Sequence, residues 1–230
     1  MFVNREKELD TLNNEYSKKG ASFTVIYGRR RMGKTALITQ YLQNKPALYY
    51  YATQVRGGQH IEQMANQMII FLNKPYLENM HFLNLEQLLI FFAEHLPENK
   101  KIIFAIDEYQ EIVKVIPECS SILQKVWDLH LQHKPIHLIL CGSVISMMHS
   151  ETLAYDAPLY GRRTSNIHLK AMKFRNIQEF IPSITPIDAM HVYASFGTVP
   201  KYLEIYDSSM DFRNNIHNSI LIKMHIFMKR

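Results

Sequence analysis

A short glycine-rich segment holds the residues whose types and spacing are best suited to chemistry. Residues 28–35 read Gly-Arg-Arg-Arg-Met-Gly-Lys-Thr, which matches the G-x-x-x-x-G-K-[ST] pattern of a phosphate-binding loop. The glycines of such a loop let backbone N–H groups and the N-terminus of the next helix face a phosphate. Lys34 would place its charge on the β and γ phosphates of a nucleotide, and the Thr35 hydroxyl would bind Mg²⁺. The predicted nucleotide-binding residues are Gly28, Arg29, Arg30, Arg31, Met32, Gly33, Lys34, Thr35 and Ala36.

The three consecutive arginines of this loop, Arg29, Arg30 and Arg31, occupy its variable positions. We expect their side chains to face solvent, where they would support anion binding or contact a partner, and we predict no catalytic role for them. The formal net charge of the chain is +5, and much of the excess lies in this loop and at Arg162 and Arg163. The positive charge can therefore be a feature of nucleotide binding and does not by itself indicate DNA binding.

An acidic pair, Asp107 and Glu108, directly follows the apolar segment 102–106. This segment is predicted to be a buried strand, and open α/β sheets bind ligands at the carboxyl ends of their strands. Asp107 is predicted to hold Mg²⁺ through its water shell, and Glu108 to orient or deprotonate an attacking water. A solvated acidic pair is the alternative interpretation, and the phosphate-binding loop upstream argues against it.

Two further polar residues are candidates for the same site. Ser143 follows the predicted strand 136–141, where it would either sense the γ phosphate or cap the next helix. Arg162 lies beside Arg163 in a turn-rich segment, and a guanidinium binds phosphate through two hydrogen bonds. One of these arginines would complete the site in the same chain or reach the nucleotide of a neighbouring subunit. The alternative is an exposed basic turn.

The elements that must position these residues alternate along the chain. Apolar and β-branched segments predict strands at 22–27, 47–52, 102–106, 136–141 and 166–169. Helical periodicity predicts helices at 2–16, with Asn4 as its cap, and at 34–42, 60–72, 85–96, 118–130, 174–180, 187–196 and 200–206. This alternation predicts an α/β fold in which a mostly parallel sheet has helices on both faces, as in a P-loop three-layer sandwich.

The strand 47–52 lies between the loop and the acidic pair, which favours the ATPase branch with an inserted strand over the GTPase layout. No N-K-x-D motif for guanine is present, so adenine is the favoured base. Tyr49, Tyr50 and Tyr51 in this strand are predicted to pack the sheet rather than to stack on bases.

The composition of the 230 residues, with 47% hydrophobic and 20% charged, is that of a globular protein. No apolar run is long enough to span a membrane and no secretory signal is recognised, so a cytoplasmic location is expected. The predicted divisions are a P-loop ATPase core at 1–170 and a helical lid at 171–213. Residues 214–230 are predicted to form a C-terminal tail, either one more helix or a truncated end.

Several segments together resemble the archaeal-type ATPases of prokaryotes, which are AAA+-like P-loop proteins related to the STAND regulatory ATPases. The resemblance extends over residues 2–206 and rests on Phe2-x-x-Arg5-Glu6-x-Glu8-Leu9, the loop 28–35, Asp107-Glu108-Tyr109-Gln110, Leu159-Tyr160-Gly161-Arg162 and Phe196-Gly197-Thr198-Val199-Pro200-Lys201-Tyr202-Leu203. It implies an AAA+-like sheet, a helical lid, bound ATP with Mg²⁺, and the roles given above to Lys34, Thr35, Asp107 and Glu108. Two departures are Thr198, where relatives carry a second glycine, and the lack of a recognisable winged-helix or nuclease-like region.

Two functions agree with these patterns. The first is ATP binding with Mg²⁺-dependent hydrolysis, in which Glu108, Lys34, Arg162 and Ser143 are the candidate catalytic residues and Thr35 and Asp107 the metal ligands. The second is a nucleotide-gated regulatory switch with slow turnover, which would contact a protein partner, a second copy of the chain or DNA. Direct nucleic-acid binding is a third interpretation and rests only on the basic character of the chain.

Overall fold

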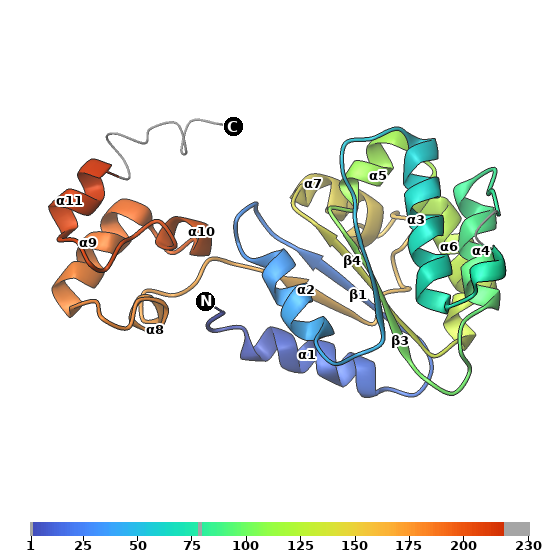
Figure 1. Cartoon of the computed structure of the whole chain (residues 1–230), viewed down its shortest axis with the longest axis horizontal. Coiled ribbons are helices and arrows are strands. Elements are labelled where there is room, and N and C mark those ends of the chain that lie inside the picture. Colours follow the sequence, from blue (N-terminus) through green and yellow to red (C-terminus); the bar gives the residue numbers. More distant parts are fainter. Residues whose placement is uncertain (1, 78–79, 219–230) are drawn as a thin grey trace.

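A five-stranded parallel sheet organises the first part of the molecule (Figure 1). In this computed structural model, residues 2–77 and 80–218 are described. The strand order is β2-β3-β4-β1-β5, and the strands are β1 (Ser22–Tyr27), β2 (Ala47–Tyr51), β3 (Ile102–Asp107), β4 (Ile136–Gly142) and β5 (Ser165–His168). Because every pairing is parallel, the carboxyl ends of the strands meet at one edge, where Tyr51 pairs with Asp107 and Tyr27 with Gly142.

Helices cover both faces of the sheet, as the near-continuous apolar strands predict. They are α1 (Glu6–Ser17), α2 (Lys34–Leu42), α3 (Gly57–Leu72), α4 (Leu85–Glu94), α5 (Gln110–Val115), α6 (Cys119–Leu129) and α7 (Ile145–Met148). Alternate residues of β3 divide between two cores, because successive side chains of a strand point to opposite faces. Phe104 packs with residues of α3, α4 and α6, whereas Ile103 packs with residues of α1 and α2. The predicted α/β three-layer architecture is therefore confirmed.

Three short helical turns complete this part of the chain: η1 (Pro75–Leu77), η2 (Leu131–His133) and the π-helical η3 (His149–Leu153). None of the helices described for this chain is long and apolar enough to cross a membrane.

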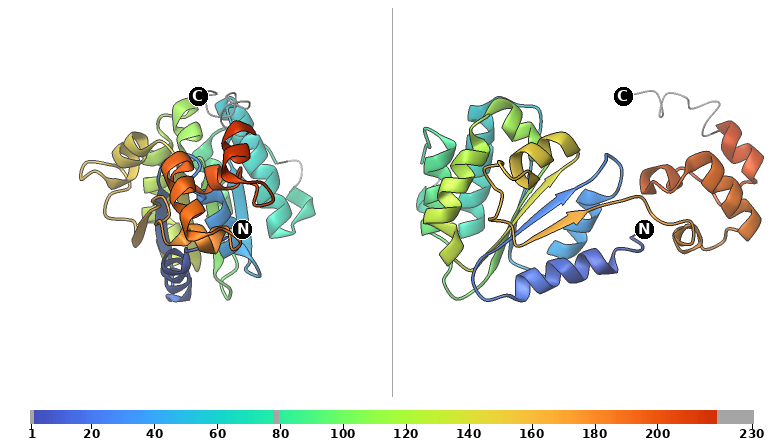
Figure 2. Two further views of the ribbon diagram at one scale, coloured as in Figure 1. Left: turned by 90° about the vertical axis from the view of Figure 1, so that its left-hand side faces the viewer. Right: turned by 180° about the vertical axis from the view of Figure 1, so that it is seen from behind.

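The chain then leaves β5 as an extended segment and forms a second group of helices (Figure 2). These are α8 (Asn176–Phe180), α9 (Pro186–Phe196), α10 (Pro200–Leu203) and α11 (Phe212–Ile216). They enclose an apolar cluster of their own, which includes Ile177, Val192 and Phe196. This separate cluster supports the proposed division into a core at 1–170 and a lid at 171–213. The predicted tail at 214–230 overlaps α11, and its residues 219–230 lie outside the described part of the chain.

The start of α1 corrects one prediction. The helix begins at Glu6 rather than at Phe2, and its N-cap is Arg5, which makes no side-chain capping bond. Asn4, the predicted cap, has a φ of 55° and donates instead to Asn176 Oδ1 at 2.8 Å. The N-terminal segment therefore contacts the lid instead of capping its own helix. The short helix α5 was not predicted, because the sequence after the acidic pair is too brief to show a helical period.

Candidate functional site

The glycine-rich loop joins β1 to α2 and has the backbone that its glycines allow. Gly28 has a φ of 157°, and a Cβ placed there would lie 2.3 Å from the carbonyl oxygen of Leu169. Gly33 has a φ of 85° and is the N-cap of the nine-residue helix α2. Larger residues would be obstructed at the first position and strained at the second. The loop therefore ends with backbone N–H groups at a helix N-terminus, which is an anion-binding arrangement.

Lys34 is the first residue of α2 and is buried in the loop, with 5% of its surface exposed. Its Nζ donates to the carbonyl oxygens of Gly28 at 3.0 Å and Arg29 at 3.1 Å. These bonds hold the ammonium across the mouth of the loop, within reach of a phosphate that enters it.

Asp107 connects the loop to the end of β3. The hydroxyl of Thr35 donates to Asp107 Oδ2 at 2.7 Å, and the Tyr49 hydroxyl donates to the same oxygen at 3.0 Å. Oδ1 accepts the backbone N–H of Glu108 at 2.9 Å, and the Asp107 side chain is fully buried. Two motifs that are far apart in the sequence thus meet in one contact.

Hydroxyl and carboxylate oxygens are the donors that Mg²⁺ prefers, and this ion usually keeps several waters beside one or two carboxylates. Thr35 and Asp107 fit that pattern. Among the described residues there is no group of three or more His, Cys, Asp or Glu side chains arranged to hold a metal.

Glu108 follows β3 in a left-handed backbone conformation, with a φ of 54°. This conformation is unfavourable for a residue with a side chain, and such strain is concentrated at functional sites. Its Oε2 accepts from Ser143 Oγ at 2.8 Å and also from the side-chain amide of Gln110. Gln110 in turn accepts the backbone N–H of Ser143 at 3.2 Å. Ser143 does not cap α7, whose N-cap is Val144.

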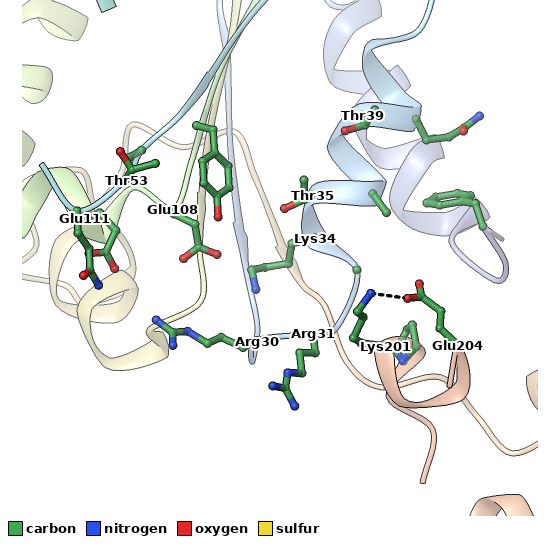
Figure 3. A pocket seen from close by; sticks show the side chains of 18 residues that line it. Arg30, Arg31, Lys34, Thr35, Thr39, Thr53, Glu108, Glu111, Lys201 and Glu204 are labelled. Atoms are coloured by element: carbon green, nitrogen blue, oxygen red, sulfur yellow. Dashed lines mark hydrogen bonds and ion pairs between the residues drawn. The ribbon is translucent and has the colours of Figure 1, made fainter. Parts of the chain in front are cut away.

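A cavity of about 980 Å³ lies over these groups (Figure 3). It is bordered by the loop, α2, the segments after β2 and β3, Phe2 of the N-terminal segment, and the lid helix α10. Its lining residues are Phe2, Arg30, Arg31, Gly33, Lys34, Thr35, Ala36, Thr39, Gln40, Tyr51, Ala52, Thr53, Gln54, Glu108, Glu111, Pro200, Lys201 and Glu204. Lys201 and Glu204 form an ion pair at 2.8 Å on its lid side. Its volume is at the upper end of the range for small-molecule sites.

Two tyrosines at the end of β2 have altered acidity. Burial raises the pKa of Tyr49, and the neighbouring Asp107 carboxylate raises it further. Burial also raises the pKa of Tyr51, with smaller contributions from Glu108 and Asp107. Both phenols are therefore neutral at physiological pH, and that of Tyr49 donates to Asp107. The sequence interpretation of Tyr49 as a packing residue missed its bond to Asp107.

Seven of the predicted residues line the cavity: Arg30, Arg31, Gly33, Lys34, Thr35, Ala36 and Glu108. Six do not line it: Gly28, Arg29, Met32, Asp107, Ser143 and Arg162. Arg29 is exposed beside it, and Met32 is buried with its carbonyl oxygen bonded to Arg5. Gly28 lies beneath the loop, against Leu169.

Arg162 is outside the site. Its Nε and Nη2 donate to the two carboxylate oxygens of Asp128 at 3.1 and 2.8 Å. The structure therefore does not support Arg162 as the residue that completes the site within this chain.

Besides the role of Tyr49, the single motifs did not reveal Arg5 and Gln110 as site residues. Arg5 is buried, with 6% of its surface exposed, and its guanidinium donates to the carbonyl oxygens of Met32 at 3.2 Å and Lys170 at 2.8 Å. It therefore fixes the loop against the start of the lid. Both residues stand within the segments that carry the family resemblance, which was the one signal in the sequence that marked them.

Comparison with known proteins agrees with this geometry. Residues 2–205 match the model of a family described as an ATPase domain predominantly from Archaea. The chain belongs to this family. Membership in the archaeal ATPase family implies an ATP-binding protein.

Members of the family and proteins of the same fold extend beyond this chain. It is 33% identical over 207 residues to the uncharacterized protein MJECL04 of Methanocaldococcus jannaschii, a match that covers 89% of this chain and 44% of that protein. A 45-residue match at 49% identity, covering 20% of this chain and 76% of the relative, is to the uncharacterized ATP-binding protein MJ0423 of the same organism. This archaeal ATPase domain thus spans less than half the length of the first relative.

Solved structures confirm the AAA+-like fold of the archaeal ATPase domain. The Walker-type ATPase PABY2304 of Pyrococcus abyssi superposes with a TM-score of 0.67 at 16% identity, over 98% of this chain and 75% of the other. The ORC2 protein of Aeropyrum pernix superposes with a TM-score of 0.61 at 16% identity, over 100% of this chain and 65% of the other.

Proposed function

We propose that this domain binds ATP together with Mg²⁺ and hydrolyses it to ADP and phosphate. The observation that carries the proposal is the 2.7 Å hydrogen bond from Thr35 to Asp107. It joins the end of the phosphate-binding loop to the acidic pair at the wall of a cavity large enough for a nucleotide. A phosphate-binding loop alone would fit many ligands, whereas its junction with a strand-end acid is typical of nucleoside triphosphatases.

Different residues of the site would bind the phosphates and the metal ion. The loop N–H groups and the Lys34 ammonium would bind the β and γ phosphates, and Lys34 would exchange its carbonyl partners for phosphate oxygens. The Thr35 hydroxyl and the Asp107 carboxylate would hold Mg²⁺, and Tyr49 would keep that carboxylate oriented. When bound, the ion supplies positive charge that stabilises the transferring phosphoryl group.

Glu108 is the proposed base. Its carboxylate points into the same space as Lys34 (Figure 3), and it would hold a water in line with the γ phosphorus and take one of its protons. The water oxygen bonds to phosphorus while the bond between phosphorus and the bridging oxygen of ADP breaks. Ser143 and Gln110 would orient the carboxylate through their bonds to it.

Phosphate release with Mg-ATP tests this proposal. We expect Glu108→Gln to lower the rate by about 10²-fold or more while ATP binding is kept, because the variant keeps its size and loses its basicity. Lys34→Ala should weaken ATP binding itself. Glu98→Gln, an exposed residue outside the cavity, is the matched control and should behave as wild type. Equal and negligible rates for wild type and Glu108→Gln, with ATP bound by both, would refute hydrolysis.

A second function, a nucleotide-gated switch, is favoured by one contact between the loop and the lid. Arg31 Nη1 donates to the Tyr202 hydroxyl at 3.1 Å, and the guanidinium lies 5.3 Å from the ring centroid of Tyr202. Because α10 also lines the cavity, a nucleotide would contact both parts and bias the lid position. Small-angle scattering with a non-hydrolysable ATP analogue tests this, and an unchanged profile at saturating ligand would exclude it. Such a switch would bind a protein partner, a second copy of this chain or DNA.

A further inference from the structure

The segment that links β5 to α8 is basic and carries no acid. Between Asp156 and Glu179 the sequence has no Asp or Glu. Within the linking residues 169–175, the apolar side chains of Leu169 and Met172 are buried. The exposed side chains are Lys170, Lys173, Phe174 and Arg175, together with His168 at the end of β5, and we call these five residues the connector strip.

The backbone of this segment is firmly held. Four hydrogen bonds fix it: Leu169 N–H to Tyr27 O at 2.7 Å, Arg5 Nη2 to Lys170 O at 2.8 Å, Met172 N–H to Thr198 O at 3.1 Å, and Lys173 N–H to Asn176 Oδ1 at 3.1 Å. The cations of the strip therefore project from an ordered scaffold rather than from a flexible loop. An ordered scaffold loses less entropy on binding a ligand.

The three strong cations of the strip are not neutralised. Within the described parts of the chain, no ion pair or side-chain hydrogen bond engages Lys170, Lys173 or Arg175. By contrast, Arg162 is paired with Asp128 and Lys201 with Glu204. Several cations on one segment that have no acidic partners in the fold can bind a polyanion.

Exposed aromatic rings accompany these charges. Phe174 is 42% exposed and Tyr193 of α9 is 51% exposed, and their rings meet edge to face with centroids 5.4 Å apart. His168 stacks on Tyr27 at 4.7 Å with the rings nearly parallel. Aromatic faces beside a line of cations are typical of surfaces on which unpaired bases stack. An acidic protein surface would use the charges but gain little from these rings.

Two carboxylates of the lid, Glu179 of α8 and Asp188 of α9, are engaged by neighbouring side chains. Glu179 accepts from Asn176 at 3.0 Å, and Asp188 accepts from Thr185 at 2.8 Å and lies 3.8 Å from His191. Glu179 and Asp188 lower the net positive charge of this part of the molecule, but neither forms an ion pair with a cation of the connector strip.

We propose that the connector strip binds a single-stranded nucleic acid. Lys170, Lys173 and Arg175 contact the phosphates, and one or two bases stack against Phe174 and Tyr193. Because none of these side chains lines the ATP cavity, this binding is independent of the proposed hydrolysis and can fail or succeed without it.

Fluorescence anisotropy of labelled 20-nucleotide oligo-dT and oligo-rU, titrated with the full chain over a range of salt, tests the proposal. The test variant carries Lys170→Glu, Lys173→Glu and Arg175→Glu. The matched control carries Lys7→Glu, Lys19→Glu and Lys100→Glu, which changes the net charge equally at exposed lysines that are also without an ion pair. A third variant, Phe174→Leu, keeps apolar bulk and removes the aromatic face. Thermal melts establish that each variant is folded.

We expect the test variant to lose about tenfold or more in affinity at low salt, and its plot of log affinity against log salt to be less steep by about 2, since three phosphate contacts are lost. The control should stay within about twofold of wild type. Phe174→Leu should lose about fivefold for single strands. Equal losses in test and control variants would overturn the proposal, as would tighter binding of a duplex of the same length. Displacement of the oligonucleotide by polyglutamate at an equal charge concentration would overturn it in favour of an acidic protein partner.

Discussion

The hydroxyl of Ser143 donates to a carboxylate oxygen of Glu108 at 2.8 Å. This bond links the residue after β4 to the residue after β3, at the edge of the sheet that faces the cavity. The strained backbone of Glu108, with its φ of 54°, turns the side chain toward that edge, and Ser143 and Gln110 hold it there. The position of the proposed base therefore depends on two neighbouring polar side chains as much as on its own strand.

Removal of the Ser143 hydroxyl should impair hydrolysis without impairing binding. We expect Ser143→Ala to lower kcat by about 10- to 100-fold, because the carboxylate of Glu108 loses a bond that orients it. The ATP dissociation constant should change by less than about twofold, since Ser143 does not line the cavity. Steady-state phosphate release and equilibrium binding of a fluorescent ATP analogue measure the two effects. Ser143→Thr keeps the hydroxyl and should retain most of the activity; equal defects in both variants would argue for packing alone.

The contacts of Arg5 predict a large loss of stability when this residue is changed. Its buried guanidinium satisfies the carbonyl oxygens of Met32 and Lys170 and pairs with Glu8 at 3.2 Å. Arg5→Ala should lower the free energy of unfolding by about 2–4 kcal/mol, because charge-assisted buried bonds are lost and their acceptors are left without partners. Urea denaturation measures this effect.

Arg5→Lys should recover only part of that loss, since a single ammonium cannot replace both Nη2, which donates to the two carbonyl oxygens, and Nη1, which pairs with Glu8. Lys7→Ala, at an exposed position of α1, is the control and should cost less than about 0.5 kcal/mol. If Arg5→Ala proved as stable as this control, the bridge between the loop and the lid would have no energetic role.

Much of the core could be predicted from the sequence, because its signals are local. The β-branched run 22–27 and the apolar run 102–106 each gave a strand within one residue of its observed bounds. Gly28, Gly33 and Lys34 have spacing and chemistry that are specific to one backbone shape. The meeting of Thr35 with Asp107 also followed, since parallel strands end at the same edge.

The remaining features depend on contacts between distant parts of the chain, which no local pattern records. Tyr49 has the composition of a packing residue, and only the register of β2 on β3 brings its hydroxyl to Asp107. Arg162 has the chemistry of a phosphate ligand, but in the folded chain its guanidinium pairs with the carboxylate of Asp128. Asn4 was a plausible cap by type and became a contact to the lid because Asn176 lies within reach.

The contact of Arg31 with Tyr202 should restrain the lid. Both side chains are partly exposed, so the hydrogen bond and the cation–π contact together are worth only about 0.5–1 kcal/mol. We expect Arg31→Ala to raise amide hydrogen exchange in α10 by about two- to fivefold, which hydrogen–deuterium exchange with mass spectrometry would detect. Tyr202→Phe keeps the ring and should give a smaller rise. Arg29→Ala, an exposed neighbour outside the cavity, should leave α10 unchanged; a rise equal to that of Arg31→Ala would show a general effect of loop charge instead.

The buried histidine of β4 should make stability depend on pH. His137 lies between two hydroxyls, with Nε2 2.8 Å from Thr24 Oγ1 and Nδ1 2.8 Å from the Tyr41 hydroxyl. Burial lowers the pKa of His137 to about 3, with smaller contributions from Lys101 and Lys18. The neutral ring satisfies both hydroxyls, and this network ties α2, which begins at Lys34, to the centre of the sheet.

Because the unfolded chain binds a proton at His137 below about pH 6.5 and the folded protein does not, acidification favours unfolding. The contribution is fully present above about pH 6.5 and is lost as the pH falls toward 3, at up to about 1.4 kcal/mol per pH unit. We expect the stability difference between wild type and His137→Gln, measured by urea denaturation, to shrink by about 1.4 kcal/mol between pH 7.5 and 5.5. The imidazole chemical shifts of His137 should stay those of a neutral ring across this range. A difference that stays constant with pH, or a ring that titrates near pH 6.5, would show that the histidine is protonated in the folded protein.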